Sequence, residues 1–306
     1  IPAEIVRGPY LQKGSHDRVT VKYRTNTATE TIVNYGTSLG SLTSTVSDLT
    51  KKINHEIEIT GLNANTTYYY DIENLNDGVY VAEDSEMYIR TAPTIGTNQF
   101  VRAWILGDAG TANNDQRNVR DEYYNYIANT TKYTNQSDLM LFLGDNAYDS
   151  GTDTEYQNAL FDIYDAMLKK SVAWSCLGNH DGYTADSNSQ TGPYYDIFTF
   201  PTAAECGGLA SGTEAYYSFD YANIHFIILD SYETDRSVGG TMYNWCLNDI
   251  QNTTQDWIIA LFHHPAYTKG SHDSDSETEL VDMRQNFLPM LETNGIDLVL
   301  NGHSHS

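Results

Sequence analysis

From residue 100 onward, short apolar runs end directly in polar residues of the kinds that bind metal ions. Five blocks follow this pattern: GDAG at 107–110, GDNAY at 144–148, GNHD at 178–181, HHP at 263–265 and GHSH at 302–305. The apolar runs lie at 101–106, 139–143, 172–177, 225–229, 257–262 and 296–300. Helical patterns lie near 115–130, 153–170, 243–253 and 277–293. Strands that alternate with helices predict an α/β fold, and the first runs are typical of strands buried on both faces.

The five blocks are expected to meet at one place. In α/β sheets, the loops that follow the carboxyl ends of the strands converge on a common crevice. Taken singly, each block has an ordinary explanation, because a Gly-Asp at a strand end is a common helix-capping turn and a lone His is usually structural. Five blocks in order, each after an apolar strand, favour a site in which carboxylates, an amide, imidazoles and a phenol bind metal ions.

The first 95 residues have a different pattern, of short strands separated by turns. Alternating segments lie at 18–23, 56–59 and 86–90, and turn signals lie at 34–36 and 76–78. This pattern predicts a small all-β sandwich. The segment 91–97 has linker composition, so we expect two domains, residues 1–95 and 96–306.

Composition excludes several classes of protein. The net charge of −24 argues against a nucleic-acid groove or an anionic membrane surface, and no apolar stretch is long enough for a membrane span. Three cysteines do not make a disulfide scaffold; Cys206 and Cys246 are candidates to pair, whereas Cys176 lies in an apolar run. The chain begins with Ile1 and has no leader, which together with the acidic composition predicts a processed protein that is secreted or periplasmic.

The order of the five blocks resembles that of the calcineurin-like metallophosphoesterases, and specifically of the purple acid phosphatases. The resemblance implies an αββα sandwich for residues 96–306 and a fibronectin-III-like domain for residues 1–95. Members of the family normally continue beyond the last His with further strands. We therefore expect that C-terminal strands are missing after Ser306, and that a further segment or a second chain is needed for stable folding.

Two departures from the superfamily pattern agree with the purple branch. Most members begin with Asp-x-His, whose His is a ligand of the first metal, and here Gly110 stands in its place. The second block supplies Tyr148, three residues after Asp145, where the purple branch carries its tyrosinate. The loss of an imidazole and the gain of a phenolate at one metal are a coupled change. In a chain with 24 tyrosines, the alternative is that Tyr148 is structural.

The resemblance implies two sets of metal ligands. The first metal would be held by Asp108, Asp145, Tyr148 and His305. The second would be held by Asp145, Asn179, His263 and His303, with Asp145 shared. A phenolate with two carboxylates favours Fe(III), whereas imidazoles with an amide oxygen suit a divalent ion, Zn, Mn or Fe(II). In the HHP block the resemblance selects His263 as the ligand and leaves His264 beside the site or toward solvent.

The resemblance also implies which residues bind phosphate and protonate the leaving group. His180 follows the ligand Asn179, and His272 lies nine residues after His263, the family spacing to an outer histidine. With Asn179, both histidines are candidates to bind substrate. The long segment 182–215 is a candidate rim of the site, where Tyr183, Tyr194 or Tyr195 either stacks on a leaving group or packs the loop.

The function implied is hydrolysis of phosphate monoesters at acidic pH, with small phosphate esters as substrates. A metal-bound hydroxide would attack in line, and His180 or His272 would act as general acid. One alternative is a colourless Mn or Zn phosphodiesterase or nucleotidase of the same superfamily. A more distant alternative is a surface binding module with structural metals.

Overall fold

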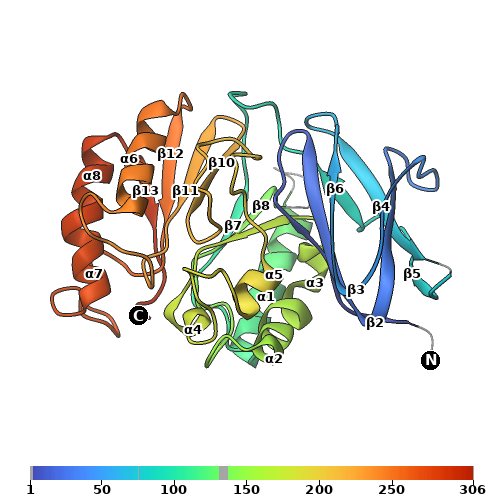
Figure 1. Cartoon of the computed structure of the whole chain (residues 1–306), viewed down its shortest axis with the longest axis horizontal. Coiled ribbons are helices and arrows are strands. Elements are labelled where there is room, and N and C mark those ends of the chain that lie inside the picture. Colours follow the sequence, from blue (N-terminus) through green and yellow to red (C-terminus); the bar gives the residue numbers. More distant parts are fainter. Residues whose placement is uncertain (1–2, 75, 131–136, 306) are drawn as a thin grey trace.

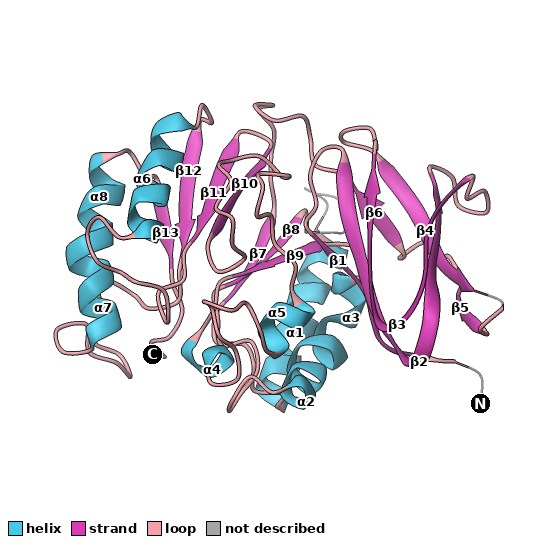
Figure 2. Ribbon diagram, in the orientation of Figure 1, coloured by secondary structure: helices cyan, strands magenta, loops and turns pink. Residues whose placement is uncertain are grey.

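A computed structural model describes residues 3–74, 76–130 and 137–305 of the chain. The N-terminal domain is all β, as predicted, and consists of six antiparallel strands in one hydrogen-bonded sheet that curls around its core (Figures 1 and 2). The strands are β1 (Ile5–Gln12), β2 (Arg18–Gly36), β3 (Ser44–Thr60), β4 (Thr67–Asn74), β5 (Val79–Val81) and β6 (Tyr88–Arg90). Strand β2 makes the curl possible, because it pairs with β3 along most of its length, and also with β1 near its start and with β4 near its end.

The C-terminal half contains two sheets. The first consists of three parallel strands, β7 (Ala103–Leu106), β8 (Leu139–Phe142) and β9 (Val172–Ser175). The second consists of β10 (Tyr217–Tyr221), β11 (Ile224–Ile228), β12 (Trp257–Leu261) and β13 (Leu298–Leu300). Strands β11, β12 and β13 are parallel, and β10 forms an antiparallel hairpin with β11. All six strands predicted for this half are present, with ends shifted by two residues or fewer.

Helices cover the sheets from outside and complete the predicted αββα sandwich (Figure 1). They are α1 (Asn114–Asn129), α2 (Asp153–Tyr156), α3 (Asp162–Leu168), α4 (Asn179–Gly182), α5 (Pro193–Ile197), α6 (Thr241–Asn252), α7 (Thr278–Asp282) and α8 (Leu288–Thr293). π-Helical turns join α2 to α3 and α7 to α8. The two sheets pack face to face, since Trp174 of β9 stacks on Phe219 of β10 with ring centroids 3.8 Å apart.

One detail of the strand prediction is wrong. Strands β8 and β9 are buried along their whole length, but Ile105 of β7 is 41% exposed. Strands β7 and β9 both lie at edges of this sheet, but β9 is covered by β1 of the N-terminal domain, where the Gln12 side chain donates to the Ala173 carbonyl at 3.1 Å. The composition of an edge strand does not show whether another domain covers it.

The N-terminal domain is docked on the C-terminal half through apolar packing and through polar contacts. Buried Arg7 donates to both carboxylate oxygens of Asp153, at 2.9 and 3.1 Å, and to the side chain of Gln157 at 2.8 Å. The Tyr10 hydroxyl donates to the carbonyl of Ile197 at 2.9 Å. These contacts fix how the curled sheet sits on α2, on the π-helical turn after it and on α5.

The cysteines and the helices settle two smaller predictions. All three cysteines are buried and unpaired, so the candidate pair Cys206 and Cys246 does not form a disulfide. Among the described residues, no helix combines the length and the apolar character needed to cross a membrane.

Candidate metal centre

The predicted ligands lie at the carboxyl ends of strands from both sheets, as expected for an α/β fold. Asp108 follows β7, Asp145 follows β8, Asn179 begins α4 after β9, His263 follows β12, and His303 and His305 follow β13. Tyr148 lies on the loop between β8 and α2. Residues spread over 198 positions of sequence therefore meet in one place.

The first predicted set comes together around the Tyr148 hydroxyl. This oxygen lies 3.2 Å from Asp108 Oδ1, 3.1 Å from Asp145 Oδ2 and 3.3 Å from His305 Nε2. His305 Nε2 also lies 3.2 Å from Asp108 Oδ1. Four side chains from three separate blocks thus place the atoms that could bind a metal ion close to the Tyr148 hydroxyl.

The second predicted set lies beside the first and shares Asp145. His263 Nε2 lies 3.1 Å from Asn179 Oδ1 and 3.4 Å from Asp145 Oδ2. Its other nitrogen, Nδ1, lies 2.7 Å from the carbonyl oxygen of Leu143, which only accepts, so Nδ1 carries a hydrogen. The ring of His303 lies 5.0 Å from that of His263, between centroids.

Three of these residues have a strained backbone. Asp108, Asp145 and His303 have φ values of 54°, 54° and 69°, in the left-handed region that residues other than glycine rarely occupy. Close approach of the loops is a second constraint, because a Cβ at Gly178 would lie 2.2 Å from the Asp145 amide nitrogen. Strain of this kind concentrates at functional sites.

Residue 110, where the general superfamily pattern described above has a histidine, has no room for a side chain in this chain. A Cβ at Gly110 would lie 2.4 Å from the amide nitrogen of Ala147 and 2.5 Å from the carbonyl carbon of Asn146. An imidazole at residue 110 is therefore incompatible with the loop that carries Tyr148. This contact gives a physical reason for the coupled change seen in the sequence.

The charges of the site fit bound cations. Burial and the negative charges of Asp145 and Asp108 raise the pKa of Tyr148 far above its ordinary value, so a neighbouring cation is needed to form a phenolate. Burial disfavours the charged form of His263, but the hydrogen bond and charge of Asp145 outweigh it and raise the pKa to about 9. Burial and the nearby His263 and His272 lower the pKa of His303 to about 4, so this ring keeps a lone pair for a metal.

The two predicted catalytic histidines lie beside different ligands. His180 has its ring 4.5 Å from that of Tyr148, between centroids, and its Nδ1 lies 2.5 Å from the carbonyl oxygen of Asp149. His272 has its ring 3.7 Å from that of His303, and its Nδ1 lies 2.8 Å from Glu277 Oε2. Both rings therefore lie at the edge of the ligand cluster.

The neighbouring residues resolve two open points. His264 is buried and does not face solvent; its Nδ1 lies 2.9 Å from the Ser231 hydroxyl. Of the three tyrosines proposed for the rim, Tyr194 and Tyr195 are buried, whereas Tyr183 is 57% exposed with its ring 5.2 Å from that of His180. Only Tyr183 of the three is free to meet a ligand.

Sequence reasoning did not assign two buried or half-buried carboxylates next to the site. Asp181 accepts from the Gly178 amide at 3.0 Å and from the Asn146 amide at 3.1 Å, and so joins the second and third blocks. Burial and the charge of Asp145 raise its pKa to about 7. Its place in the GNHD block is the signal that could have identified it. Glu277, which holds His272, has no comparable local signal.

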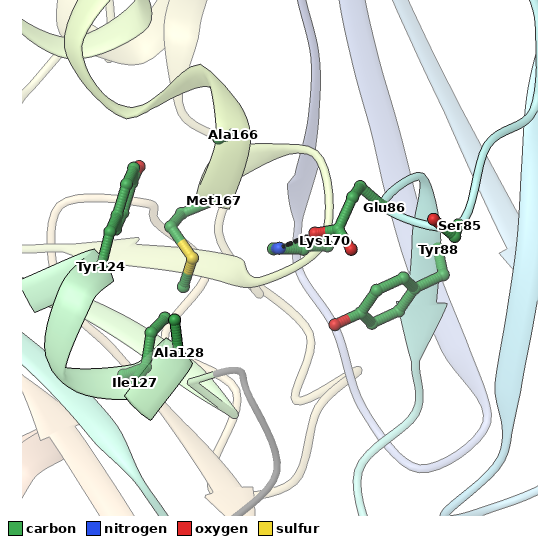
Figure 3. A pocket seen from close by; sticks show the side chains of 9 residues that line it. All are labelled: Ser85, Glu86, Tyr88, Tyr124, Ile127, Ala128, Ala166, Met167 and Lys170. Carbon is green, nitrogen blue, oxygen red and sulfur yellow. Dashed lines mark hydrogen bonds and ion pairs between the residues drawn. The ribbon is translucent and has the colours of Figure 1, made fainter. Parts of the chain in front are cut away.

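A cavity of about 520 Å³ lies away from this centre, between the N-terminal domain and helices α1 and α3 (Figure 3). It is lined by Ser85, Glu86, Tyr88, Tyr124, Ile127, Ala128, Ala166, Met167 and Lys170. Lys170 and Glu86 form an ion pair at its wall. None of the predicted site residues lines it, so the metal centre and this cavity are separate features.

Comparisons with known proteins agree with this geometry. The calcineurin-like phosphoesterase family model matches residues 101–306, and the model for the purple acid phosphatase N-terminal domain matches residues 8–91. The chain is 27% identical to purple acid phosphatase 15 of Arabidopsis thaliana over 84% of this chain and 49% of that protein. It is 25% identical to purple acid phosphatase 18 of the same plant, over 100% of this chain and 69% of that protein. The chain thus spans about half to two thirds of the length of these relatives.

A solved structure shares the fold. The purple acid phosphatase PPD1 from yellow lupin (Lupinus luteus) seeds superposes with a TM-score of 0.75 over 98% of this chain and 59% of that chain, at 17% identity. The likeness extends over both domains and confirms the predicted fold class, while the two family models confirm the predicted resemblance. The chain therefore belongs to the calcineurin-like phosphoesterase family, and it carries the N-terminal domain of the purple acid phosphatases.

Proposed function

We propose that this chain hydrolyses phosphate monoesters at acidic pH, at a binuclear centre of Fe(III) and a divalent ion. The observation that carries the proposal is the convergence of four side chains that can bind a metal ion. The Tyr148 hydroxyl lies 3.1–3.3 Å from oxygens of Asp108 and Asp145 and from His305 Nε2, and His305 Nε2 lies 3.2 Å from Asp108 Oδ1. A phenolate with two carboxylates is a hard, anionic donor set that suits Fe(III). The names of the relatives agree with this chemistry.

The ligands divide as the resemblance implies. The first ion is held by Asp108, Asp145, Tyr148 and His305, and the second by Asp145, Asn179, His263 and His303. The second set, with two imidazoles and an amide oxygen, suits Zn, Mn or Fe(II). When bound, the two ions supply the positive charge that draws a phosphate ester to a chain of net charge −24 and that stabilises the phosphoryl group during transfer.

His180 is assigned proton donation to the leaving oxygen. Its Nδ1 hydrogen is directed to the Asp149 carbonyl, so Nε2 is the atom left to exchange a proton. Its amide donates to Asp145 Oδ1 at 2.9 Å, which fixes the residue against the shared ligand. General acid catalysis requires a donor within hydrogen-bond reach of the leaving oxygen, and a ring fixed at the edge of the ligand cluster is a suitable candidate for that role.

His272 is assigned to hold the phosphate, together with Asn179 and His180. The hydrogen bond from Nδ1 to Glu277 orients its ring over His303. Although burial opposes ionisation of Glu277, hydrogen bonds from the Asp273 amide and His272 hold its pKa below the ordinary value. Glu277 thus loses its charge only at lower pH than an ordinary glutamate, and its hydrogen bond keeps the ring in place.

The test is to purify the protein, count Fe and other metals, and record the visible spectrum and the turnover of a chromogenic phosphomonoester at pH 4–7. We expect one iron and one divalent ion per chain, with a tyrosinate-to-iron band. Tyr148→Phe should remove the band and lower turnover by about 100-fold, because it removes a ligand. The control is Tyr183→Phe, which alters a neighbouring tyrosine outside the ligand set and should keep the band.

Two outcomes would contradict the proposal. A colourless protein with two Mn or Zn ions that still hydrolyses phosphate esters would favour the phosphodiesterase or nucleotidase alternative. A protein that turns over no phosphate ester, and whose bound metal only stabilises the fold, would favour the binding-module alternative. A band that persists in Tyr148→Phe would refute the ligand assignment.

The domain boundary and the location are part of the same proposal. We place the boundary near residue 95, and this is supported by the two family models, which end at residue 91 and begin at residue 101. A secreted or periplasmic location follows from the acidic composition and the acidic pH proposed for activity.

A further inference from the structure

The first turn of α2 carries a carboxylate that accepts hydrogen bonds from the loop in front of it. Glu155 Oε1 accepts the amide hydrogen of Asp149 at 2.7 Å, and Oε2 accepts those of Ser150 and Thr152 at 3.2 and 2.8 Å. A helix-capping box of Thr152 and Glu155 accounts for the contact with Thr152. The hydrogen bonds from Asp149 and Ser150 go beyond capping and fix the preceding loop.

The loop fixed by Glu155 contacts the proposed proton donor. The Asp149 carbonyl oxygen lies 2.5 Å from His180 Nδ1, and this contact sets the orientation and tautomer of the ring. On the far side of the loop, the Thr184 hydroxyl donates to the carbonyl oxygens of Ser150 and Gly151, at 3.0 and 2.7 Å. Thr184 therefore restrains the end of the loop, whereas Glu155 restrains the Asp149 residue that meets His180.

Helix α2 is in turn held by the N-terminal domain. Arg7 Nη1 donates to Asp153 Oδ1 at 2.9 Å, and Arg24 Nη1 donates to Oδ2 at 2.7 Å. Burial opposes ionisation of Asp153, but the hydrogen bonds from Arg24 and Arg7 lower its pKa to about 2. The link between the domains therefore persists at acidic pH.

We propose that Glu155 is a positioning residue for His180. Its carboxylate holds the Asp149 carbonyl on His180 Nδ1, and the N-terminal domain holds the helix of Glu155 through Asp153. The inference rests on the proposed function, in which His180 protonates the leaving oxygen. Loss of Glu155 then weakens proton donation more than it weakens the rest of the reaction.

The experiment compares two substrates in the metal-loaded Glu155→Gln variant. A glutamine offers one acceptor oxygen in place of two, so it loses the hydrogen bond to Asp149 or those to Ser150 and Thr152. 4-Nitrophenyl phosphate has a leaving group that departs without a proton, whereas an alkyl phosphate needs one. We expect kcat to fall by about tenfold for the alkyl phosphate and by less than about twofold for 4-nitrophenyl phosphate.

Two further measurements show that the effect passes through His180. In a His180→Ala background, Glu155→Gln should change the ratio of the two kcat values by less than about twofold, since effects that act through one residue do not add. In the metal-free protein, ¹⁵N NMR of the His180 ring should show a protonated Nδ1 that loses its single tautomer in Glu155→Gln. The matched control is Glu214→Gln, which changes a carboxylate that accepts the Phe200 amide at 2.8 Å away from this loop.

The outcomes separate this inference from the proposed function. An equal fall for both substrates in Glu155→Gln, or the same change in Glu214→Gln, would overturn the positioning role. If His180→Ala alters the ratio of the two kcat values and Glu155→Gln does not, only the inference about Glu155 fails. If His180→Ala leaves the ratio unchanged, the proton-donor role of His180 fails, and the inference fails with it.

Discussion

The carbonyl oxygen of Gly110 accepts the amide hydrogen of Tyr148 at 2.9 Å. This hydrogen bond joins the first and second blocks at the two positions where the sequence departs from the general superfamily pattern. Because a side chain at residue 110 would collide with the backbone of Ala147, the bond requires glycine there. The missing imidazole and the added phenol are thus one structural arrangement.

Substitution of Gly110 is expected to disturb the metal centre as well as stability. In Gly110→Ala the new methyl group lies 2.4 Å from the Ala147 amide nitrogen, so the loop must move, at a cost of about 1–3 kcal/mol. We expect a lower midpoint of urea unfolding, less bound iron and a weaker visible band. Gly107→Ala is the control, because its Cβ meets no atom closer than 3.5 Å. Equal iron content in the wild type and Gly110→Ala would contradict the argument.

The interface between the domains is expected to depend on Arg7. Residue Arg7 is 5% exposed, and its guanidinium donates to Asp153 and Gln157 of the C-terminal half. Arg7→Met keeps the apolar stem but removes these hydrogen bonds, and we expect the free energy of unfolding to fall by about 2 kcal/mol. Lys52→Met, which removes an exposed ion pair with Asp48, should cost less than about 0.5 kcal/mol. Urea unfolding followed by fluorescence measures both, and similar losses in the two variants would count against the interface.

Stability is expected to fall at alkaline pH because of a buried histidine outside the metal centre. His225 Nδ1 lies 2.7 Å from Asp220 Oδ1 and Nε2 lies 3.0 Å from Asp249 Oδ2. Burial opposes its charge, but these carboxylates outweigh burial and raise the pKa from 6.5 to about 9. The charged form thus stabilises the folded state fully below about pH 6.5, and this contribution of about 3 kcal/mol is lost as pH rises through 9.

The free energy of unfolding at pH 6, 7.5, 9 and 10 tests this prediction. Asp249→Asn removes one carboxylate and should shift the loss to lower pH and make it smaller. His263, whose pKa is also raised, is the same in both proteins, so the difference between the two pH profiles isolates His225. Parallel profiles would show that His225 does not titrate as described.

Metal binding is expected to distinguish the two adjacent histidines. His263 Nε2 points at Asn179 and Asp145, whereas His264 is held by Ser231. His263→Asn should lose the divalent ion, and with it the rise in melting temperature that metal gives to the wild type by binding only the folded state. His264→Asn should retain two metals per chain. Calorimetry of each protein with and without metal gives the answer, and the reverse result would exchange the two assignments.

Much of the C-terminal half could be predicted because its signals are local. Apolar runs of strand length, helical periodicity and the spacing of blocks are each contained in a few residues, so short windows predict β8, β9 and β11. The curl of the N-terminal sheet could not be predicted, because it depends on β2 pairing with β1 near its start and with β4 near its end, while β3 stays paired along most of its length.

The carboxylates around the site show where sequence reasoning stops. The capping pattern from Thr152 to Glu155 is visible in the sequence, but the contact between Asp149 and His180 links residues 31 apart. Glu277 Oε2 lies 3.6 Å from His303 Nε2, and no pattern in either segment predicts this proximity. The exposure of Tyr183 and the burial of Tyr194 also depend on which surfaces the long loop covers.

The sequence by itself determined which residue types stand at the strand ends, and hence the family and the candidate ligands, because these depend on composition and spacing along the chain. The tertiary structure decided which of those side chains meet, why residue 110 has no room for a side chain, and which carboxylates hold the histidines. The physical reason is that ligand geometry, burial and charge depend on atoms brought together by folding, and distance along the chain does not measure their separation in space.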